Sequence, residues 1–133
     1  MAFIEHALGK THYTVRGARS EKPPIVWLHG GPGGTHNPKS RLFDLAEGRQ
    51  VYAYTQMGSG KSGDLPKRRR TVATFVKELH TLIATWGLDR FHLMGGSWGA
   101  TLALEYGLRH PESGLQSLVL QSPMLSAIDW QRD

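Results

Sequence analysis

Short apolar runs alternate with glycine-rich breaks along the chain, and one longer segment has a clear helical period. The apolar runs at 25–28 and 51–54 are each followed by a cluster of glycines, which predicts two buried strands with abrupt ends. Residues 72–86 carry apolar side chains at i, i+3, i+4 and i+7 spacing, which predicts an amphipathic helix. Thr71 is a suitable N-cap for this helix, and Gly87 a suitable C-cap.

The remaining segments complete an alternating order of strands and helices. We predict two strands, 2–6 and 12–16, around a turn at Gly9-Lys10, and a short helix over 38–47. Further along we predict a strand over 91–94, a helix over 98–109 that is stopped by Pro111, and a last strand over 115–121. This order is typical of an α/β fold with a mostly parallel sheet and helices on both faces. Right-handed crossovers place the loops at the carboxyl ends of the strands along one edge, where such sheets bind ligands.

Length and composition narrow the class of protein. The 133 residues suffice for one domain with a buried core. With 39% hydrophobic residues and a mean hydropathy of −0.37, the composition predicts no membrane span. The chain has no cysteine, which excludes disulfides, thiolate metal sites and a cysteine nucleophile. Its first residues lack a basic region followed by an apolar run, so we expect no signal peptide and a cytoplasmic location.

The net charge of +5 is concentrated in one run of basic residues. Residues 67–70 hold four of the 16 basic side chains, and without them 12 basic residues face 11 acidic ones, a balance of +1. A nucleic-acid or acidic-surface patch would call for interleaved aromatic residues or a second basic stripe, and the sequence has neither. The run is more typical of a solvated loop before a helix, and we expect no nucleic-acid partner.

Residues 95–99, Gly-Gly-Ser-Trp-Gly, form a G-x-S-x-G motif between a predicted strand and a predicted helix. A serine on such a tight turn has a strained backbone and an exposed hydroxyl at the sheet edge. The flanking glycines avoid collisions with the neighbouring strand and helix, and the helix N-terminus favours the negative charge that develops in acyl transfer. The motif predicts Ser97 as a nucleophile, against the alternative of an ordinary serine in a glycine-rich turn.

A second loop, His-Gly-Gly-Pro-Gly-Gly at 29–34, directly follows the predicted strand at 25–28. Acyl transfer needs backbone N–H donors aimed at the oxyanion, one from the residue after the nucleophile, here Trp98, and one from a loop after an earlier strand. A flexible connection is the alternative, but the two motifs in this order are more specific than either alone. The residues predicted to support the site are His29, Gly30, Pro32, Gly33, Gly95, Gly96 and Gly99.

A third glycine loop, residues 58–63, matches G-x-G-x-x-G and the end of a phosphate-binding loop. Both motifs require a helix that begins at the loop and holds the phosphate, but Asp-Leu-Pro and the basic run follow instead. A phosphate-binding loop also needs glycine at position 55, where Thr55 stands. We therefore expect no nucleotide, and no other cofactor.

The seven histidines provide neither a metal site nor a general base. None has convincing zinc-ligand spacing with a third ligand, so we predict no metal. In a fold of this kind the base is a histidine that follows the nucleophile and the acid. His110 is the only histidine after Ser97, it precedes Asp129 and Asp133, and its expected role is helix termination. The sequence thus predicts a nucleophile and oxyanion donors without a base or an orienting acid.

Together these motifs resemble the proline iminopeptidase (prolyl aminopeptidase) family of α/β-hydrolase serine peptidases. The similar segments are His-Gly-Gly-Pro-Gly-Gly at 29–34, Gln-Met-Gly-Ser-Gly-Lys-Ser at 56–62 and Gly-Gly-Ser-Trp-Gly-Ala-Thr-Leu-Ala-Leu-Glu-Tyr at 95–106. The resemblance extends over nearly the whole chain. It implies that Ser97 is the nucleophile and that Gly31 and Trp98 supply the oxyanion N–H groups.

Members of that family are about twice as long, and their second half carries a helical cap, an acidic pocket for the substrate's free amine, and the triad Asp and His. The resemblance implies that residues 1–133 are the N-terminal portion of an incomplete α/β-hydrolase domain, with residues 126–133 leading into the cap. The family usually has Asp where this chain has Thr55. If that Asp tethers the loop at 56–62, the substitution is expected to loosen it.

The resulting expectation is a serine aminopeptidase fragment with little or no activity alone. Its substrate would be a peptide or amino-acid amide with a free N-terminus, and a complementing C-terminal segment would supply the base and the acid. Two alternatives stay open: an esterase or amidase on the same scaffold, and a non-catalytic truncated protein or binding module that associates through an open sheet edge.

Overall fold

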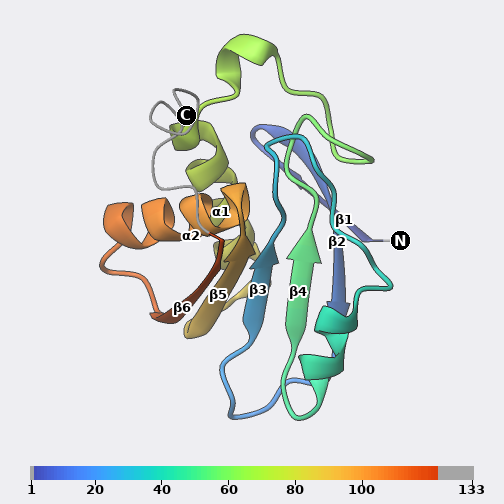
Figure 1. The fold of residues 1–133 in the computed structure, drawn as a ribbon, viewed down its shortest axis with the longest axis vertical. Helices are drawn as coiled ribbons and strands as arrows, with labels where there is room; N and C mark the ends of the chain where they lie inside the picture. Colours follow the sequence, from blue (N-terminus) through green and yellow to red (C-terminus); the bar gives the residue numbers. More distant parts are fainter. Residues whose placement is uncertain (1, 123–133) are drawn as a thin grey trace.

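The structure, a computed structural model, describes residues 2–122 and contains one six-stranded mixed sheet (Figure 1). Its spatial order is β1-β2-β4-β3-β5-β6. The strands are β1 (Ala2–His6), β2 (Gly9–Arg16), β3 (Ile25–Leu28), β4 (Val51–Tyr54), β5 (Phe91–Gly96) and β6 (Leu115–Gln121). Strands β4, β3, β5 and β6 are parallel, whereas β2 pairs antiparallel with both β1 and β4. The predicted mostly parallel sheet is confirmed.

The N-terminal hairpin turns two residues earlier than the sequence predicted. Gly9 pairs with His6 and belongs to β2, so the turn consists of residues 7 and 8. The Leu8 N–H donates a hydrogen bond to His6 Nδ1 (3.2 Å), and this side-chain contact closes the turn. The predicted turn at Gly9-Lys10 was therefore wrong, because the turn lies at residues 7 and 8, where the His6 imidazole accepts the hydrogen bond that closes it.

The two α-helices begin and end at the predicted residues. Helix α1 spans Val72–Trp86 and helix α2 spans Trp98–Arg109. The Thr71 hydroxyl accepts a hydrogen bond from Thr74 N (3.2 Å), and Gly87 ends α1 in the left-handed conformation with φ 70°. Both predicted caps of α1 are confirmed.

The helix predicted over residues 38–47 is a shorter, tighter 3-10 helix, η1 (Arg41–Ala46). None of its residues is fully buried, so tertiary packing gives little support to a longer α-helix there. A second 3-10 turn, η2 (Lys67–Arg69), lies in the basic run. The segment from 126 to 133, which the sequence suggested leads into a cap, lies outside the described residues.

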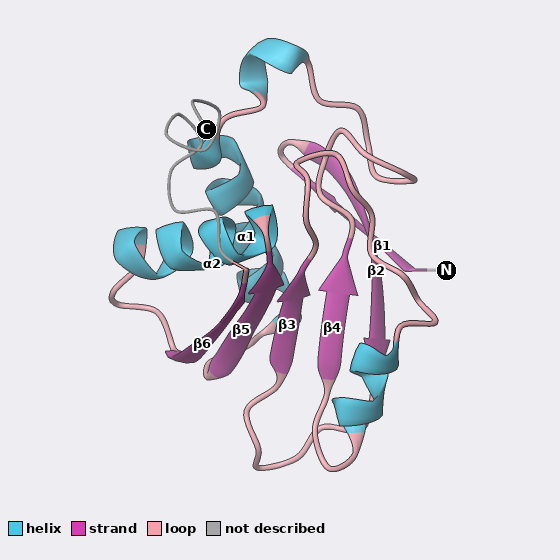
Figure 2. Ribbon diagram, in the orientation of Figure 1, coloured by secondary structure: helices cyan, strands magenta, loops and turns pink. Residues whose placement is uncertain are grey.

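Both α-helices lie on the same face of the sheet, next to each other (Figure 2). The connections from β4 to β5 and from β5 to β6 cross the sheet in the same direction, and right-handed crossovers then place both helices on one side. Their apolar side chains pack on Val26, Leu28 and Leu93, all fully buried. The prediction of helices on both faces therefore does not describe residues 2–122.

The opposite face is lined by residues of β3, β5 and β6 and is only partly covered in the described part of the chain. Val119 is 47% exposed there, and a shallow cavity of about 210 Å³ is lined by Ile25, Arg49, His92, Met94, Ser117 and Val119. The two faces thus differ sharply: one is the core, and the other is a half-open surface.

Candidate active site

Three glycine-rich loops meet at the edge where the parallel strands end (Figure 1). They are the β3 loop (residues 29–34), the β4 loop (residues 55–63) and the elbow (residues 95–99). Since β3 lies between β4 and β5 in the sheet, the β3 loop is flanked by the other two. This edge is where open α/β sheets bind ligands.

Ser97 stands on a strained turn between β5 and α2. Its backbone has φ 53° and ψ −117°, in the region that side-chain-bearing residues rarely adopt. The Ser97 N–H donates to Gln121 O (2.9 Å) at the end of β6, which holds the turn in place. The side chain is exposed, and its hydroxyl makes no hydrogen bond to any residue in the range 2–122. The hydroxyl is therefore open to solvent at the N-terminus of α2.

Close packing of backbone explains two of the elbow glycines. A Cβ on Gly99 would collide with the carbonyl oxygen of Leu28, and a Cβ on Gly95 would collide with that of Gly99. A Cβ on Gly96 would meet the Trp27 ring at 3.3 Å and the Gln121 side chain at 3.8 Å. Gly95 and Gly99 are therefore required where β5, α2 and β3 approach one another, while Gly96 is under less constraint.

The β3 loop lies against the elbow. A Cβ on Gly30 would lie 3.7 Å from Ser97 Cβ and 3.5 Å from Gly96 O. The next residue, Gly31, has φ 130°, and a Cβ there would lie 2.5 Å from Gly33 N. Its bond to Pro32 is cis. The loop thus folds back tightly, with its backbone beside the serine.

Two backbone N–H groups beside Ser97 have no partner among residues 2–122. Trp98 is the first residue of α2, so its N–H has no partner inside the helix. Neither this group nor the Gly31 N–H donates a hydrogen bond within the described chain. The arrangement therefore leaves free the two donors that the sequence and the family resemblance suggested, next to a free hydroxyl.

His29 is buried and uses both ring nitrogens in the loop scaffold. Because carbonyl oxygens only accept, Nδ1 donates to Gly30 O (2.7 Å), and Nε2 accepts from Gln56 N (2.9 Å). Burial lowers the pKa of His29, partly opposed by the hydrogen bond to Gly30. The ring is neutral and fully engaged, so His29 supports the loop and has no free nitrogen for proton transfer from Ser97.

Thr55 is hydrogen-bonded at the start of the β4 loop. Its hydroxyl contacts His36 Nδ1 (2.7 Å) and accepts from His36 N (3.1 Å), and its own N–H donates to His12 O (2.9 Å). His36 is held in turn by the Thr14 hydroxyl (2.9 Å). The pKa of His36 falls to about 4, chiefly by burial and then by the nearby imidazoles of His12 and His29. These bonds tether the start of the β4 loop through Thr55, and the loosening relative to the family's Asp stays a prediction.

The rest of the β4 loop is closed on itself and on β2. Gly58 N donates to Gly63 O (2.8 Å), and Gly63 N donates to Lys10 O (2.7 Å). The Ser62 hydroxyl donates to Thr55 O and accepts from His12 N (2.9 Å). No α-helix begins at the loop, since the next one starts at Val72. Most of the loop amides and this hydroxyl are bonded within the protein, and the expectation of no nucleotide stays a prediction.

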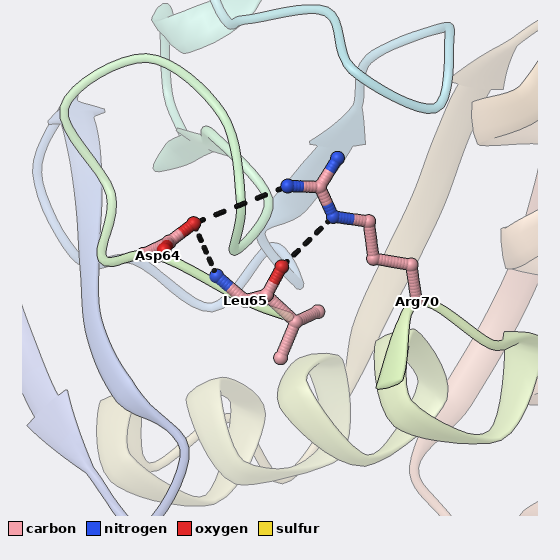
Figure 3. A network of polar contacts seen from close by, with 3 residues as sticks. All are labelled: Asp64, Leu65 and Arg70. Atoms are coloured by element: carbon pink, nitrogen blue, oxygen red, sulfur yellow. Dashed lines mark hydrogen bonds and ion pairs between the residues drawn. The ribbon is translucent and has the colours of Figure 1, made fainter. Parts of the chain in front are cut away.

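The basic run begins beside a small anchored turn (Figure 3). Arg70 Nε donates to Leu65 O (2.9 Å), its Nη2 lies 4.0 Å from the Asp64 carboxylate, and Asp64 accepts from Leu65 N (2.9 Å). The other three basic residues, 67–69, are exposed and make no ion pair among the described residues. The run is therefore a solvated loop held at one end by Arg70.

His110 is far from Ser97. The two residues flank α2, whose 12 residues rise about 18 Å at 1.5 Å per residue. The His110 ring stacks on His80 (3.9 Å between centroids), and its Nδ1 contacts Glu112 (3.1 Å). Within residues 2–122, no set of three or more histidine or acidic side chains could hold a metal ion, and no helix is long and apolar enough to cross a membrane.

Two buried polar residues escaped the sequence reading. Gln56 is 1% exposed and bonds to both His29 and Trp98, while Glu78 of α1 is fully buried and accepts from Met57 N (3.1 Å) and Thr11 Oγ1 (2.6 Å). Burial raises the pKa of Glu78 to about 7, against the lowering effect of those hydrogen bonds. Gln56 was marked only as the first residue of the segment 56–62 that resembles the family, and nothing in the helical pattern singled out Glu78.

Fold and loop arrangement together define the class of protein. Residues 23–133 match the alpha/beta hydrolase fold family, and the chain belongs to that family. It is 43% identical over 128 residues to a proline iminopeptidase of Lactobacillus helveticus and 44% identical over 128 residues to one of Lactobacillus acidophilus. Each alignment covers 93% of this chain and 44% of the relative, so the chain spans less than half the length of these relatives. The resemblance to proline iminopeptidases is confirmed.

Solved structures agree with this assignment. The crystal structure of a proline iminopeptidase from Mycobacterium smegmatis superimposes with a TM-score of 0.85 at 33% identity, covering 98% of this chain and 47% of that one. The crystal structure of VinJ superimposes with a TM-score of 0.89 at 36% identity, covering 98% of this chain and 46% of that one. The predicted α/β-hydrolase fold is confirmed.

Proposed function

We propose that this chain carries the nucleophile and oxyanion donors of a serine hydrolase that releases N-terminal proline from peptides. The observation that carries the proposal is Ser97, a residue with φ 53° whose hydroxyl is exposed and unpartnered within residues 2–122, at the N-terminus of α2. Strain of this kind persists where the surrounding structure imposes it for a function. The similarity to proline iminopeptidases supports the substrate class.

In the proposed reaction, Ser97 Oγ attacks the carbonyl carbon of the N-terminal residue, and a histidine takes the hydroxyl proton. The N–H groups of Gly31 and Trp98 hold the resulting oxyanion, aided by the N-terminal end of the α2 dipole. The protonated histidine then gives its proton to the departing amine, which leaves an acyl-enzyme on Ser97. Water attacks this ester and releases the free amino acid.

The histidine and its orienting acid come from outside residues 2–122. Of the histidines near the loops, His29 has both ring nitrogens engaged and His36 contacts threonine hydroxyls through both of its own. The ring of the third, His12, packs against Phe3 and His36. His110 lies at the other end of α2. We therefore propose that a further segment, joined to this chain or supplied to it, provides the base and acid and completes the substrate pocket.

The test uses a prolyl chromogenic amide with the complete protein that contains this chain. Release of the chromophore, and its loss in Ser97→Ala, is the expected result, while the 133-residue chain alone should release no more than its own Ser97→Ala variant. A complete protein that cleaves simple esters but no prolyl amide would replace the peptidase by an esterase. Turnover of ordinary enzymatic size by the 133-residue chain alone would show that the base lies within it.

A further inference from the structure

Gln56 connects the β3 loop and the elbow through a buried side-chain amide. Its Nε2 donates to His29 O (3.2 Å), and its Oε1 accepts from the indole Nε1–H of Trp98 (2.9 Å). Its backbone N–H also donates to His29 Nε2 (2.9 Å). One residue of the β4 loop therefore bonds both to the elbow that carries Ser97 and to the neighbouring β3 loop.

The orientation of this amide follows from its partners. An indole N–H can only donate, and a backbone carbonyl can only accept. The amide oxygen must therefore face Trp98 and the amide nitrogen must face His29. Gln56 is 1% exposed and Trp98 is 6% exposed, so solvent does not replace either bond if the amide is lost.

The two partners of Gln56 lie close to the proposed oxyanion donors. His29 precedes Gly31 by two residues in the tightly folded β3 loop, and Trp98 carries the second donor on its own backbone. The Trp98 ring is also fixed edge-on against Phe75 of α1, with 5.9 Å between centroids. The amide of Gln56 therefore acts on the distance between the Gly31 and Trp98 N–H groups, which must both reach one oxyanion.

We propose that Gln56 is a positioning residue that holds the Gly31 and Trp98 N–H groups at the separation needed to bind one oxyanion. The inference rests on the proposed function, because it assumes that these donors serve acyl transfer at Ser97. Gln56 itself touches no reacting atom. It acts by fixing the β3 loop against the elbow, so that the donors need no rearrangement when charge develops.

The first test measures the backbone motion of the 133-residue chain by ¹⁵N relaxation. In the wild type we expect order parameters near 0.85 at Gly31 and Trp98, falling below about 0.6 in Gln56→Met, while α1 stays rigid. The matched control is Gln50→Met at the opposite end of β4, where the side chain bonds only to Tyr52 OH (3.1 Å) among residues 2–122. Unchanged order parameters at both positions in Gln56→Met would overturn the proposal.

Gln56→Glu separates positioning from general damage to the fold, and also serves if Gln56→Met does not fold. A carboxylate accepts from Trp98 but repels His29 O, whereas a protonated carboxyl donates to His29 O and accepts from Trp98 as the amide does. Compared with the wild type at each pH, the variant should be mobile at Gly31 near pH 8 and rigid again as the carboxyl protonates. A defect that does not change with pH would contradict the proposal.

The second test measures the catalytic consequence in the complete protein. Gln56→Met should lower kcat for a prolyl amide by about 10²-fold with KM changed less than about threefold, because misplaced donors weaken binding of the transition state more than of the substrate. Equal kcat in an active wild type and Gln56→Met would overturn the positioning role. If instead the wild type releases no proline while the relaxation differences persist, the proposed function fails and the loop-fixing role of Gln56 stands without catalysis.

Discussion

The elbow and the β4 loop are built from the same residue types at the same edge of the sheet, yet their serine hydroxyls differ in hydrogen bonding. Both follow a parallel strand, and both contain glycines around a serine. In the elbow, Ser97 is strained and exposed and its hydroxyl has no partner within residues 2–122. In the β4 loop, the Ser62 hydroxyl both donates and accepts, to Thr55 O and from His12 N.

This contrast shows that a motif gains chemical meaning from the partners of its polar groups. A helix starts directly after Ser97 and leaves the Trp98 N–H without a partner among residues 2–122, whereas in the β4 loop the amides of Gly58 and Gly63 donate to Gly63 O and Lys10 O. A loop whose donors are already used cannot cradle a phosphate or an oxyanion. The elbow keeps a hydroxyl and a backbone donor without partners among residues 2–122, whereas the Ser62 hydroxyl and most amides of the β4 loop bind neighbouring segments.

The largest expected effect tests the packing of the elbow. Gly99→Ala places a methyl group on the carbonyl of Leu28, a backbone atom that cannot move aside, so we expect a loss of at least about 3 kcal/mol in the free energy of unfolding. Gly96→Ala in the same motif meets only side-chain atoms, those of Trp27 and Gln121, and should lose less than about 1 kcal/mol. Urea denaturation measures both, and equal losses would show that the elbow is not closely packed against β3.

A smaller effect separates the two serines. Ser62→Ala removes a donor from Thr55 O and leaves the His12 N–H without its acceptor, which should destabilise the chain by about 1–3 kcal/mol. Ser97→Ala removes only an unpartnered, exposed hydroxyl and should change stability by less than about 0.5 kcal/mol. Denaturation midpoints at constant m-value give both stability losses. A larger loss in Ser97→Ala than in Ser62→Ala would show that Ser97, and not Ser62, is the bonded serine.

Titratable groups hold the β4 loop, so the stability of the chain should depend on pH. The pKa of His36 is about 4 in the folded chain and near 6.5 unfolded, so its contribution is lost as the pH falls from about 6.5 to 4. The pKa of Glu78 is about 7 folded against 4.5 unfolded, so the folded state holds its proton more tightly and gains stability as the pH falls from 7 to 4.5.

Glu78→Gln should therefore make the loss of stability on acidification steeper. Binding of one proton changes the free energy of unfolding by at most about 1.4 kcal/mol per pH unit, and the difference between variant and wild type should lie between pH 4.5 and 7. The amide can still accept from Met57 N and contact Thr11, so the loop contacts are preserved. Unfolding curves at several pH values measure the slope, and a slope identical to that of the wild type would mean that Glu78 ionises normally.

The smallest effect is expected in the basic run. Lys67→Ser, Arg68→Ser and Arg69→Ser should each change stability by less than about 0.5 kcal/mol, because these side chains are exposed and unpaired among the described residues. Arg70→Ser removes the bond to Leu65 O and should lose about 1 kcal/mol. We also expect no binding of a DNA duplex at low ionic strength by fluorescence anisotropy, and salt-sensitive binding that the serine variants abolish would reverse this assignment.

Most of the elements could be predicted because glycine, proline and apolar periodicity mark their limits. Helix α1 and the strands β3 and β4 begin and end at the predicted residues for this reason. The short helix predicted over 38–47 is only the 3-10 helix η1, since a local apolar pattern does not reveal that none of its side chains becomes fully buried. The placement of both helices on one face depends on strand order, which no local pattern encodes.

The candidate site divides in the same way. Ser97 and the two glycine loops are local motifs, so the sequence revealed them. Gln56, Glu78 and His36 are polar residues that look like surface positions, and their burial appears only when β2, α1 and three loops come together. Long-range hydrogen bonds such as Trp98 to Gln56 have no sequence periodicity, and the support of the site was therefore hidden.

The central position of β3 has a consequence for the order in which the protein is made. Ile25 pairs with Val51 on one side and with His92 on the other, so a ribosome synthesises β3 long before its second neighbour. The β1–β2 hairpin can form as soon as it is synthesised, but one edge of β3 stays unpaired until β5 has been made. An unpaired strand edge can pair with any other strand. The nascent chain is thus most open to wrong pairing in the interval before the segment that carries Ser97 emerges.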